Sequence, residues 1–166
     1  MQLLNFVLFQ AAWFAGVIGA ARGEPLLGTV VVAAVIAWHL SVSARPAVEA
    51  RLVGAALAVG LVFESLCVQL GQVSFASGQP DPRFAAYWMV ALWGLLATSL
   101  NVTMRWLKRR WLLAAVLGAV AGPMSYWAGV RLGAARFIDA GAALTTLAVS
   151  WALLMPAMVW LATRFD

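Results

Sequence analysis

Six continuous apolar segments constrain the fold of this chain more than any other feature of its sequence. Short breaks with charged residues or proline separate them, and they cover residues 3–21, 26–43, 50–73, 85–106, 111–130 and 138–162. Each segment is close to the roughly 20 residues that a helix needs to cross the hydrocarbon core of a bilayer. A β-barrel would instead show short strands of alternating polarity. The pattern predicts an all-α, polytopic membrane bundle of six transmembrane helices, with residues 1–166 as one domain.

The composition supports the membrane class and excludes several others. Hydrophobic residues make up 64% of the 166 residues and charged residues 10%, whereas a soluble domain is about half apolar and about a quarter charged. The single cysteine and single histidine exclude an intrachain disulfide and any metal or haem centre that needs several such ligands. We therefore expect no metal and no cofactor. The bases lie between apolar segments, which is typical of membrane topology and does not indicate a nucleic-acid partner.

The distribution of lysine and arginine between the two sides of the bundle predicts its orientation. Seven of these bases fall on the side of the two termini and four on the other side. Because cytoplasmic loops carry the excess of positive charge, both termini are predicted to lie in the cytoplasm. The connection between the fourth and fifth segments contributes most, and we expect it to contact lipid headgroups or a partner protein through Arg105, Lys108, Arg109 and Arg110.

A polar arc on the third apolar segment is the main candidate site. At 100° per residue, Glu64, Ser65, Gln69 and Gln72 fall within about 140° of one helix face. A carboxyl group at this depth is costly unless it is paired, protonated or hydrated, so Glu64 is a candidate functional group. Tyr126 lies at a similar depth on the fifth segment. The arrangement is consistent with a funnel that opens outward above Glu64, and the alternative is a structural pin between helices.

A second polar group lies nearer the predicted cytoplasmic side and consists of Asn5, Gln10, His39 and Asn101. A lone histidine is more often a hydrogen-bonding partner than a catalyst, although its titration near neutral pH would suit a proton relay. His39 and Glu64 differ in depth by about half of the bilayer, which argues against direct contact.

Small residues on the fifth segment predict a helix-packing seam. They recur every three or four positions and are Gly118, Gly122, Ser125, Gly129 and Gly133. The arrangement of three helices followed by three more raises the question of an inverted repeat. Residues 1–80 and 81–166 share no convincing identity, however, so the sequence does not predict one.

Short motifs are spread over essentially the whole chain: Asn5-Phe6-x-x-Phe9-Gln10-x-x-Trp13-Phe14, His39-Leu40, Phe63-Glu64-Ser65, Gly122-Pro123-x-x-Tyr126 and Leu132-Gly133. They resemble a family of small multi-pass proteobacterial inner-membrane proteins that is catalogued only as a domain of unknown function. The resemblance implies a location in the bacterial inner membrane. It also implies a genomic neighbourhood of lipid-modifying enzymes of the cyclopropane-fatty-acid-synthase type, and it supplies no catalytic residues.

Three functional hypotheses follow. The first is an accessory or lipid-binding factor, with membrane lipids and a membrane-associated enzyme as its partners. The second is a small proton-coupled transporter with Glu64 as its titrating group, for which a homo-oligomer would provide a wider path. The third is an intramembrane enzyme that acts on lipid with Glu64 as acid or base, although no nucleophile dyad accompanies it. The absence of such a dyad favours binding or proton handling over hydrolysis.

Overall fold

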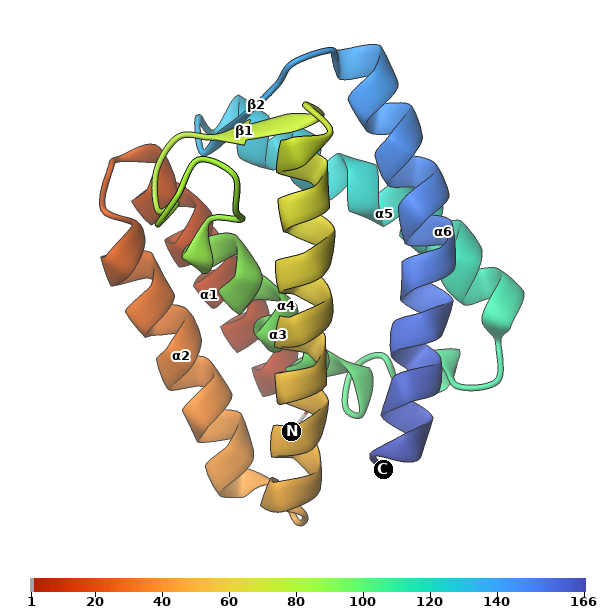
Figure 1. Cartoon of the computed structure of the whole chain (residues 1–166). Helices are drawn as coiled ribbons and strands as arrows, with labels where there is room; N and C mark the ends of the chain where they lie inside the picture. Colours follow the sequence, from red (N-terminus) through yellow and green to blue (C-terminus); the bar gives the residue numbers. More distant parts are fainter. Residues whose placement is uncertain (1) are drawn as a thin grey trace.

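The computed structural model describes residues 2–166 and contains six α-helices there (Figure 1). The helices are α1 (Gln2–Ala21), α2 (Pro25–Val42), α3 (Pro46–Gln69), α4 (Tyr87–Leu100), α5 (Trp111–Arg131) and α6 (Ala140–Arg164). The connections contain two short strands and a 3₁₀ turn, namely β1 (Val73–Phe75), β2 (Ala135–Phe137) and η1 (Arg105–Leu107). Five of these helices are long and apolar enough to cross a membrane, and α4 is shorter. The predicted all-α multi-pass class is confirmed.

The third helix begins at Pro46 and ends at Gln69, whereas the sequence predicted residues 50–73. Proline suits the first helical position because it has no N–H to leave unpaired and its φ is already helical. The helix ends early because Gly71 adopts a φ of 64°, a left-handed cap that glycine takes without strain. The earlier start brings Glu49 into the first turn of α3, which matters for the site described below.

The fourth helix is the buried centre of the bundle. It covers Tyr87–Leu100 instead of the predicted residues 85–106, and ten of its 14 residues are buried. It packs against α1, α2, α3 and α6 (Figure 1). Its length of about 21 Å is less than a hydrocarbon core of about 30 Å. The chain before it folds back into the bundle, where the Tyr87 N–H donates to the Gly78 carbonyl at 2.9 Å. The surrounding helices thus bury a helix that is apolar on all sides.

Consecutive helices form three hairpins, α1–α2, α3–α4 and α5–α6, and glycine permits close approach within them. A Cβ atom on Gly28 would lie 2.4 Å from the Ala15 carbonyl oxygen, and one on Gly118 would lie 2.1 Å from the Trp151 carbonyl oxygen. Such contacts let helix backbones pack tightly where no hydrophobic effect drives association. Two residues of the predicted seam of α5, Gly118 and Gly122, lie against α6. Ser125 is exposed, nothing lies within 4 Å of a Cβ atom on Gly129, and Gly133 is beyond the helix end as its cap.

The units α3–β1–α4 and α5–β2–α6 are internal structural repeats. Leu70-Gly71 and Leu132-Gly133 end the first helix of each unit with the same backbone hydrogen bonds and a positive φ at glycine. These positions are 62 residues apart, and Glu64 and Tyr126 have the same separation. In the second helices a Trp-small-Leu-Leu sequence recurs as Trp93-Gly94-Leu95-Leu96 and Trp151-Ala152-Leu153-Leu154.

The two repeats contact each other through equivalent residues. β1 and β2 pair antiparallel, so that Val73 lies opposite Phe137 and Phe75 lies opposite Ala135. Such a reciprocal exchange of equivalent contacts is the property of a two-fold interface. A comparison of the two halves of the sequence missed this relationship because the repeat begins only after the α1–α2 hairpin.

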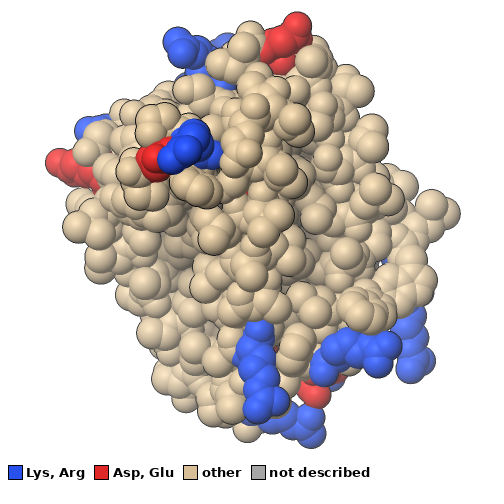
Figure 2. Space-filling view, viewed as in Figure 1, with Lys and Arg blue, Asp and Glu red and all other residues tan. Residues whose placement is uncertain are grey.

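The two ends of the bundle differ in charge (Figure 2). We call the end that holds both termini in Figure 1 the basic end. It carries seven bases and two acids, which are Arg45, Arg51, Arg105, Lys108, Arg109, Arg110, Arg164, Glu49 and Asp166. The opposite end carries four bases and three acids, which are Arg22, Arg83, Arg131, Arg136, Glu24, Asp81 and Asp139. Nearly all of the net charge of +5 is therefore concentrated at one end.

Candidate functional site

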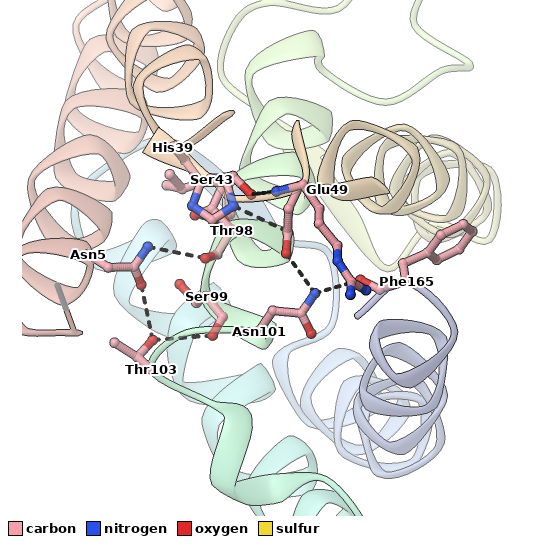
Figure 3. A network of polar contacts seen from close by, with 11 residues as sticks. Asn5, His39, Ser43, Glu49, Thr98, Ser99, Asn101, Thr103 and Phe165 are labelled. Carbon is pink, nitrogen blue, oxygen red and sulfur yellow. Dashed lines mark hydrogen bonds and ion pairs between the residues drawn. The ribbon is translucent and has the colours of Figure 1, made fainter. Parts of the chain in front are cut away.

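A buried hydrogen-bond network closes the basic end of the bundle (Figure 3). His39 Nε2 lies 3.2 Å from Glu49 Oε2, and Asn101 Nδ2 donates to Glu49 Oε1 at 2.9 Å. The same Asn101 nitrogen donates to the Phe165 carbonyl at 2.9 Å. Glu49 thus has a partner on each carboxylate oxygen, and the network joins α2, α3, the end of α4 and the end of α6.

A second branch of the network attaches the first helix. Asn5 Nδ2 donates to the Thr98 carbonyl at 3.1 Å, and the Thr103 hydroxyl donates to Asn5 Oδ1 at 3.2 Å (Figure 3). Two buried polar atoms here, Ser99 Oγ and Asn101 Oδ1, have no hydrogen-bond partner among residues 2–166. Unpaired buried polar atoms are uncommon in native structures, so the network is not fully satisfied.

An open cavity of about 520 Å³ lies over this network. The residues that line it come from α2, α3, the chain after α4 and the end of the chain after α6, and they are His39, Val42, Ser43, Ala44, Arg45, Val48, Glu49, Asn101, Val102, Arg105, Phe165 and Asp166. We call it the basic-end cavity. It combines an apolar wall with two arginines and a buried polar floor, and this combination can hold an amphiphilic anion.

Asp166 occupies the basic side of the cavity. Its side chain lies 3.1 Å from Arg105 Nη2 and 2.9 Å from Lys108 Nζ, and its backbone carbonyl accepts from Arg45 Nη1 at 2.8 Å. The hydrogen bond from Lys108, followed by the positive charges of Lys108, Arg105 and Arg45, lowers the pKa of the Asp166 carboxyl. The three cations thus already hold one anionic group in this structure.

A second buried site lies deep in the bundle between the two repeats. Trp93 Nε1 donates to Glu64 Oε1 at 2.8 Å, and the Tyr126 hydroxyl donates to the same oxygen. Trp151 stacks on Trp93, with ring centroids 4.9 Å apart and an interplanar angle of 23°. We call Glu64, Tyr126, Trp93 and Trp151 the axial cluster, because equivalent residues of the two repeats meet there.

Glycine holds the two tryptophans of the axial cluster in equivalent positions. A Cβ atom on Gly60 would lie 2.3 Å from Trp93 Cγ, and one on Gly122 would lie 2.3 Å from Trp151 Cγ. Each tryptophan therefore packs closely against a glycine of the partner helix in its own hairpin. Glu64 Oε2 and Trp151 Nε1 are buried and have no hydrogen-bond partner among residues 2–166, so the cluster has one unpaired acceptor and one unpaired donor.

The structure separates the residues of the predicted polar arc. Glu64 and Tyr126 lie together in the axial cluster, and Glu64 is 0% exposed. Ser65 accepts the Ala85 N–H at 3.1 Å and Gln69 donates to the Arg83 carbonyl, so both hold the connection between α3 and α4. Gln72 lies beyond the end of α3, where its side chain donates to the Leu70 carbonyl. Because Glu64 is not exposed, the structure does not show the funnel that we considered above it.

Three of the four residues of the second predicted polar group lie together in the structure. Gln10 lies outside the group, and Glu49 is an additional member. Asn5, His39 and Asn101 belong to the network at the basic end, whereas Gln10 is exposed on α1. Sequence reasoning missed Glu49 because it placed this residue in a loop. Pro46 could have revealed it, since a helix that begins at proline places Glu49 one turn inside.

The predicted basic contact residues divide into two pairs. Arg105 and Lys108 contact Asp166, whereas Arg109 and Arg110 are exposed.

Among residues 2–166 no group of three His, Cys, Asp or Glu side chains lies in a position to hold a metal ion.

The fold and its sites define a multi-pass membrane protein whose polar groups are buried between helices and at one charged end. Comparison with known proteins is consistent with that class. The model of the family described as "Protein of unknown function (DUF2878)" matches residues 2–157, and the chain belongs to this family. No curated protein and no solved structure matches the chain.

Proposed function

We propose that this protein binds the headgroup of an anionic membrane lipid in the basic-end cavity. The observation that carries the proposal is the cavity itself, which places Arg45 and Arg105 beside an apolar wall and above the buried Asn101 amide. A guanidinium group matches the paired oxygens of a phosphate in both geometry and charge. Asn101 lines the cavity, but its unpaired Oδ1 is buried, so the two arginines carry the recognition of the phosphodiester headgroup.

The position of the cavity supports a lipid over a water-soluble anion. The long helices expose many large apolar side chains, among them Leu112 at 81% and Leu153 at 71%, as expected of faces that contact acyl chains. A cavity at the end of such a bundle lies at the level of the headgroups. Basic residues there attract anionic lipid by about 1 kcal/mol each. With the orientation predicted from the positive charges, this would be the cytoplasmic leaflet of the inner membrane.

Asp166 acts as an internal competitor in this proposal. Its carboxyl group is held by Arg105 and Lys108, and Arg105 is one of the two arginines that would bind a phosphate. Without lipid, the arginines are paired with Asp166. When the lipid binds, its phosphate replaces Asp166 as their anionic partner. Removal of the Asp166 charge is expected to strengthen lipid binding severalfold.

Native mass spectrometry of the purified protein, with phosphatidylglycerol and phosphatidylcholine as competing lipids, tests the proposal. The wild type is expected to retain phosphatidylglycerol selectively. The double variant Arg45→Gln/Arg105→Gln is expected to bind it at least about tenfold more weakly, which corresponds to the loss of one charged hydrogen bond.

The control removes the same charge from the opposite end of the bundle. Arg22→Gln/Arg83→Gln lowers the net charge equally but leaves the cavity intact. If both double variants weaken binding to the same extent, the lipid responds to overall charge and the cavity is not its site.

A further inference from the structure

We propose that the axial cluster is a proton-binding site, in which Glu64 takes up and releases a proton at the interface between the two repeats. The proposal does not depend on lipid binding at the basic end. It concerns a carboxyl group that no cation of residues 2–166 pairs with. The group lies deep in the bundle, at the point where equivalent residues of the repeats meet.

The hydrogen bonds of Glu64 favour a neutral carboxylic acid over a carboxylate. Both donors, the Trp93 indole and the Tyr126 hydroxyl, point at Oε1, whereas Oε2 has no partner. With Oε1 as the carbonyl oxygen, an acid keeps both hydrogen bonds and carries its proton on Oε2. A carboxylate would instead leave a charged oxygen without a donor in a position that is 0% exposed, which is costly.

The described side chains around Glu64 include no positive charge that could neutralise its carboxylate in place of a proton. The titratable side chains that face it are Tyr126 from α5 and Cys67 from its own helix. α4 and α6 contribute Trp93 and Trp151, which do not titrate. No lysine, arginine or histidine within residues 2–166 forms an ion pair with Glu64. Proton release therefore changes the net charge of the cluster by one unit.

Proton release must also act on the interface between the repeats. The proton leaves Oε2 for a water molecule, so that a carboxylic acid and water become a carboxylate and hydronium. Because no donor of the described residues, the unpaired Trp151 Nε1 included, bonds to Glu64 Oε2 in the closed cluster, we expect water to enter between the two hairpins. An ionisable group at the midplane between parallel repeats is the arrangement that membrane carriers use for coupling.

Infrared difference spectroscopy of the full chain in lipid bilayers tests whether Glu64 binds a proton. Between acidic and alkaline buffer, the wild type is expected to lose a carbonyl band of a carboxylic acid. Glu64→Gln should lack this band, because the amide cannot titrate but can still accept from Trp93 and Tyr126. Glu49→Gln is the matched control and should retain it. Identical spectra for the wild type and Glu64→Gln at every pH would overturn the proposal.

The single cysteine reports whether proton release opens the interface. Cys67 lies one turn beyond Glu64 on α3 and is 3% exposed. At the same alkaline pH, a membrane-permeable maleimide is expected to label the wild type several times faster than Glu64→Gln, which imitates the protonated state. Both proteins are compared at one pH, and a negative charge on Glu64 would by itself slow the reaction of the nearby thiol. Faster labelling of the wild type would therefore report the opening of the interface. Equal labelling rates would contradict the coupling between proton and interface.

Discussion

Glu49 and Glu64 are two carboxyl groups on one helix, and their surroundings differ. Glu49 lies at the basic end, where His39 and Asn101 satisfy both of its oxygens and an open cavity lies beside it. Glu64 lies four turns further along α3, where two donors share one oxygen and no cation in the described part of the chain pairs with it. One helix thus carries a fully paired acid at the membrane surface and a partly paired acid in its interior.

The comparison shows that the same residue type serves two tasks, set by what surrounds it. At the basic end, a complete set of partners fixes Glu49, and we propose that the neighbouring arginines bind a ligand. In the axial cluster, Glu64 Oε2 has no partner among the described residues, so the carboxyl group must be either protonated or hydrated. The following predictions test this difference, from the largest expected effect to the smallest.

Enlargement of Gly122 should break the axial cluster. In Gly122→Leu the new side chain would begin 2.3 Å from Trp151 Cγ, so the tryptophan has to leave its stack on Trp93. We expect a loss of stability of about 3 kcal/mol or more, measured by thermal unfolding in detergent. Gly129→Ala is the control, because nothing lies within 4 Å of a Cβ atom there. Equal effects of the two substitutions would show that the tryptophan stack is not a tight contact.

Removal of the Glu49 carboxyl should break the basic end. Glu49→Ala leaves the buried His39 and Asn101 without their shared partner, at an expected loss of about 3 kcal/mol. Glu49→Gln retains an acceptor for Asn101 and should cost less. Unfolding by denaturant measures both. A smaller loss for the alanine variant than for the glutamine variant would contradict the network.

Tyr126→Phe should weaken the axial cluster without altering its packing. It removes one of two hydrogen bonds to Glu64 Oε1 and should lower stability by about 1 kcal/mol. The other tyrosine of the chain, Tyr87, is 39% exposed, and Tyr87→Phe serves as the control with an expected effect near zero. The same denaturant titration measures both variants, and a larger effect at Tyr87 would argue against the interaction at Glu64.

Asp166→Asn should have the smallest effect and a defined pH dependence. The pKa of Asp166 is lowered by Lys108, Arg105 and Arg45, so the carboxylate stabilises the fold above its unfolded pKa of about 3.9. That contribution is lost as the pH falls through the lower pKa of the folded state. We expect a difference under about 1 kcal/mol at neutral pH and none in strong acid. A difference that grows toward acidic pH would have the wrong sign.

Local sequence rules were enough for the class and number of the helices. Each long helix satisfies its own backbone hydrogen bonds, and lipid accepts its apolar side chains, so a run of apolar residues is sufficient to indicate it. The α3 boundaries were less well predicted because Pro46 and Gly71 set them. The length of α4 was overestimated for another reason. Burial by the surrounding helices, which no local pattern records, allows a helix of 14 residues in this place.

The candidate sites depended on contacts between distant positions. The sequence indicated Glu64 because a carboxyl group within an apolar segment stands out, and it indicated Tyr126 by depth. It could not show that both are equivalent positions of a repeat or that Trp93 completes the pair. Likewise it found His39 and Asn101 but not Glu49, which the helix start at Pro46 carries into the network.

By itself the sequence determined that this chain is a six-helix membrane protein with a basic end and an acid in its interior. These properties follow from composition and spacing, which act one segment at a time. Only the tertiary structure decided which polar groups meet, because hydrogen bonds such as Glu64 to Tyr126 and Asn101 to Glu49 join residues 62 and 52 positions apart. Their geometry is set by the packing of glycine against tryptophan and by the pairing of two short strands, and neither has a signature within a single helix.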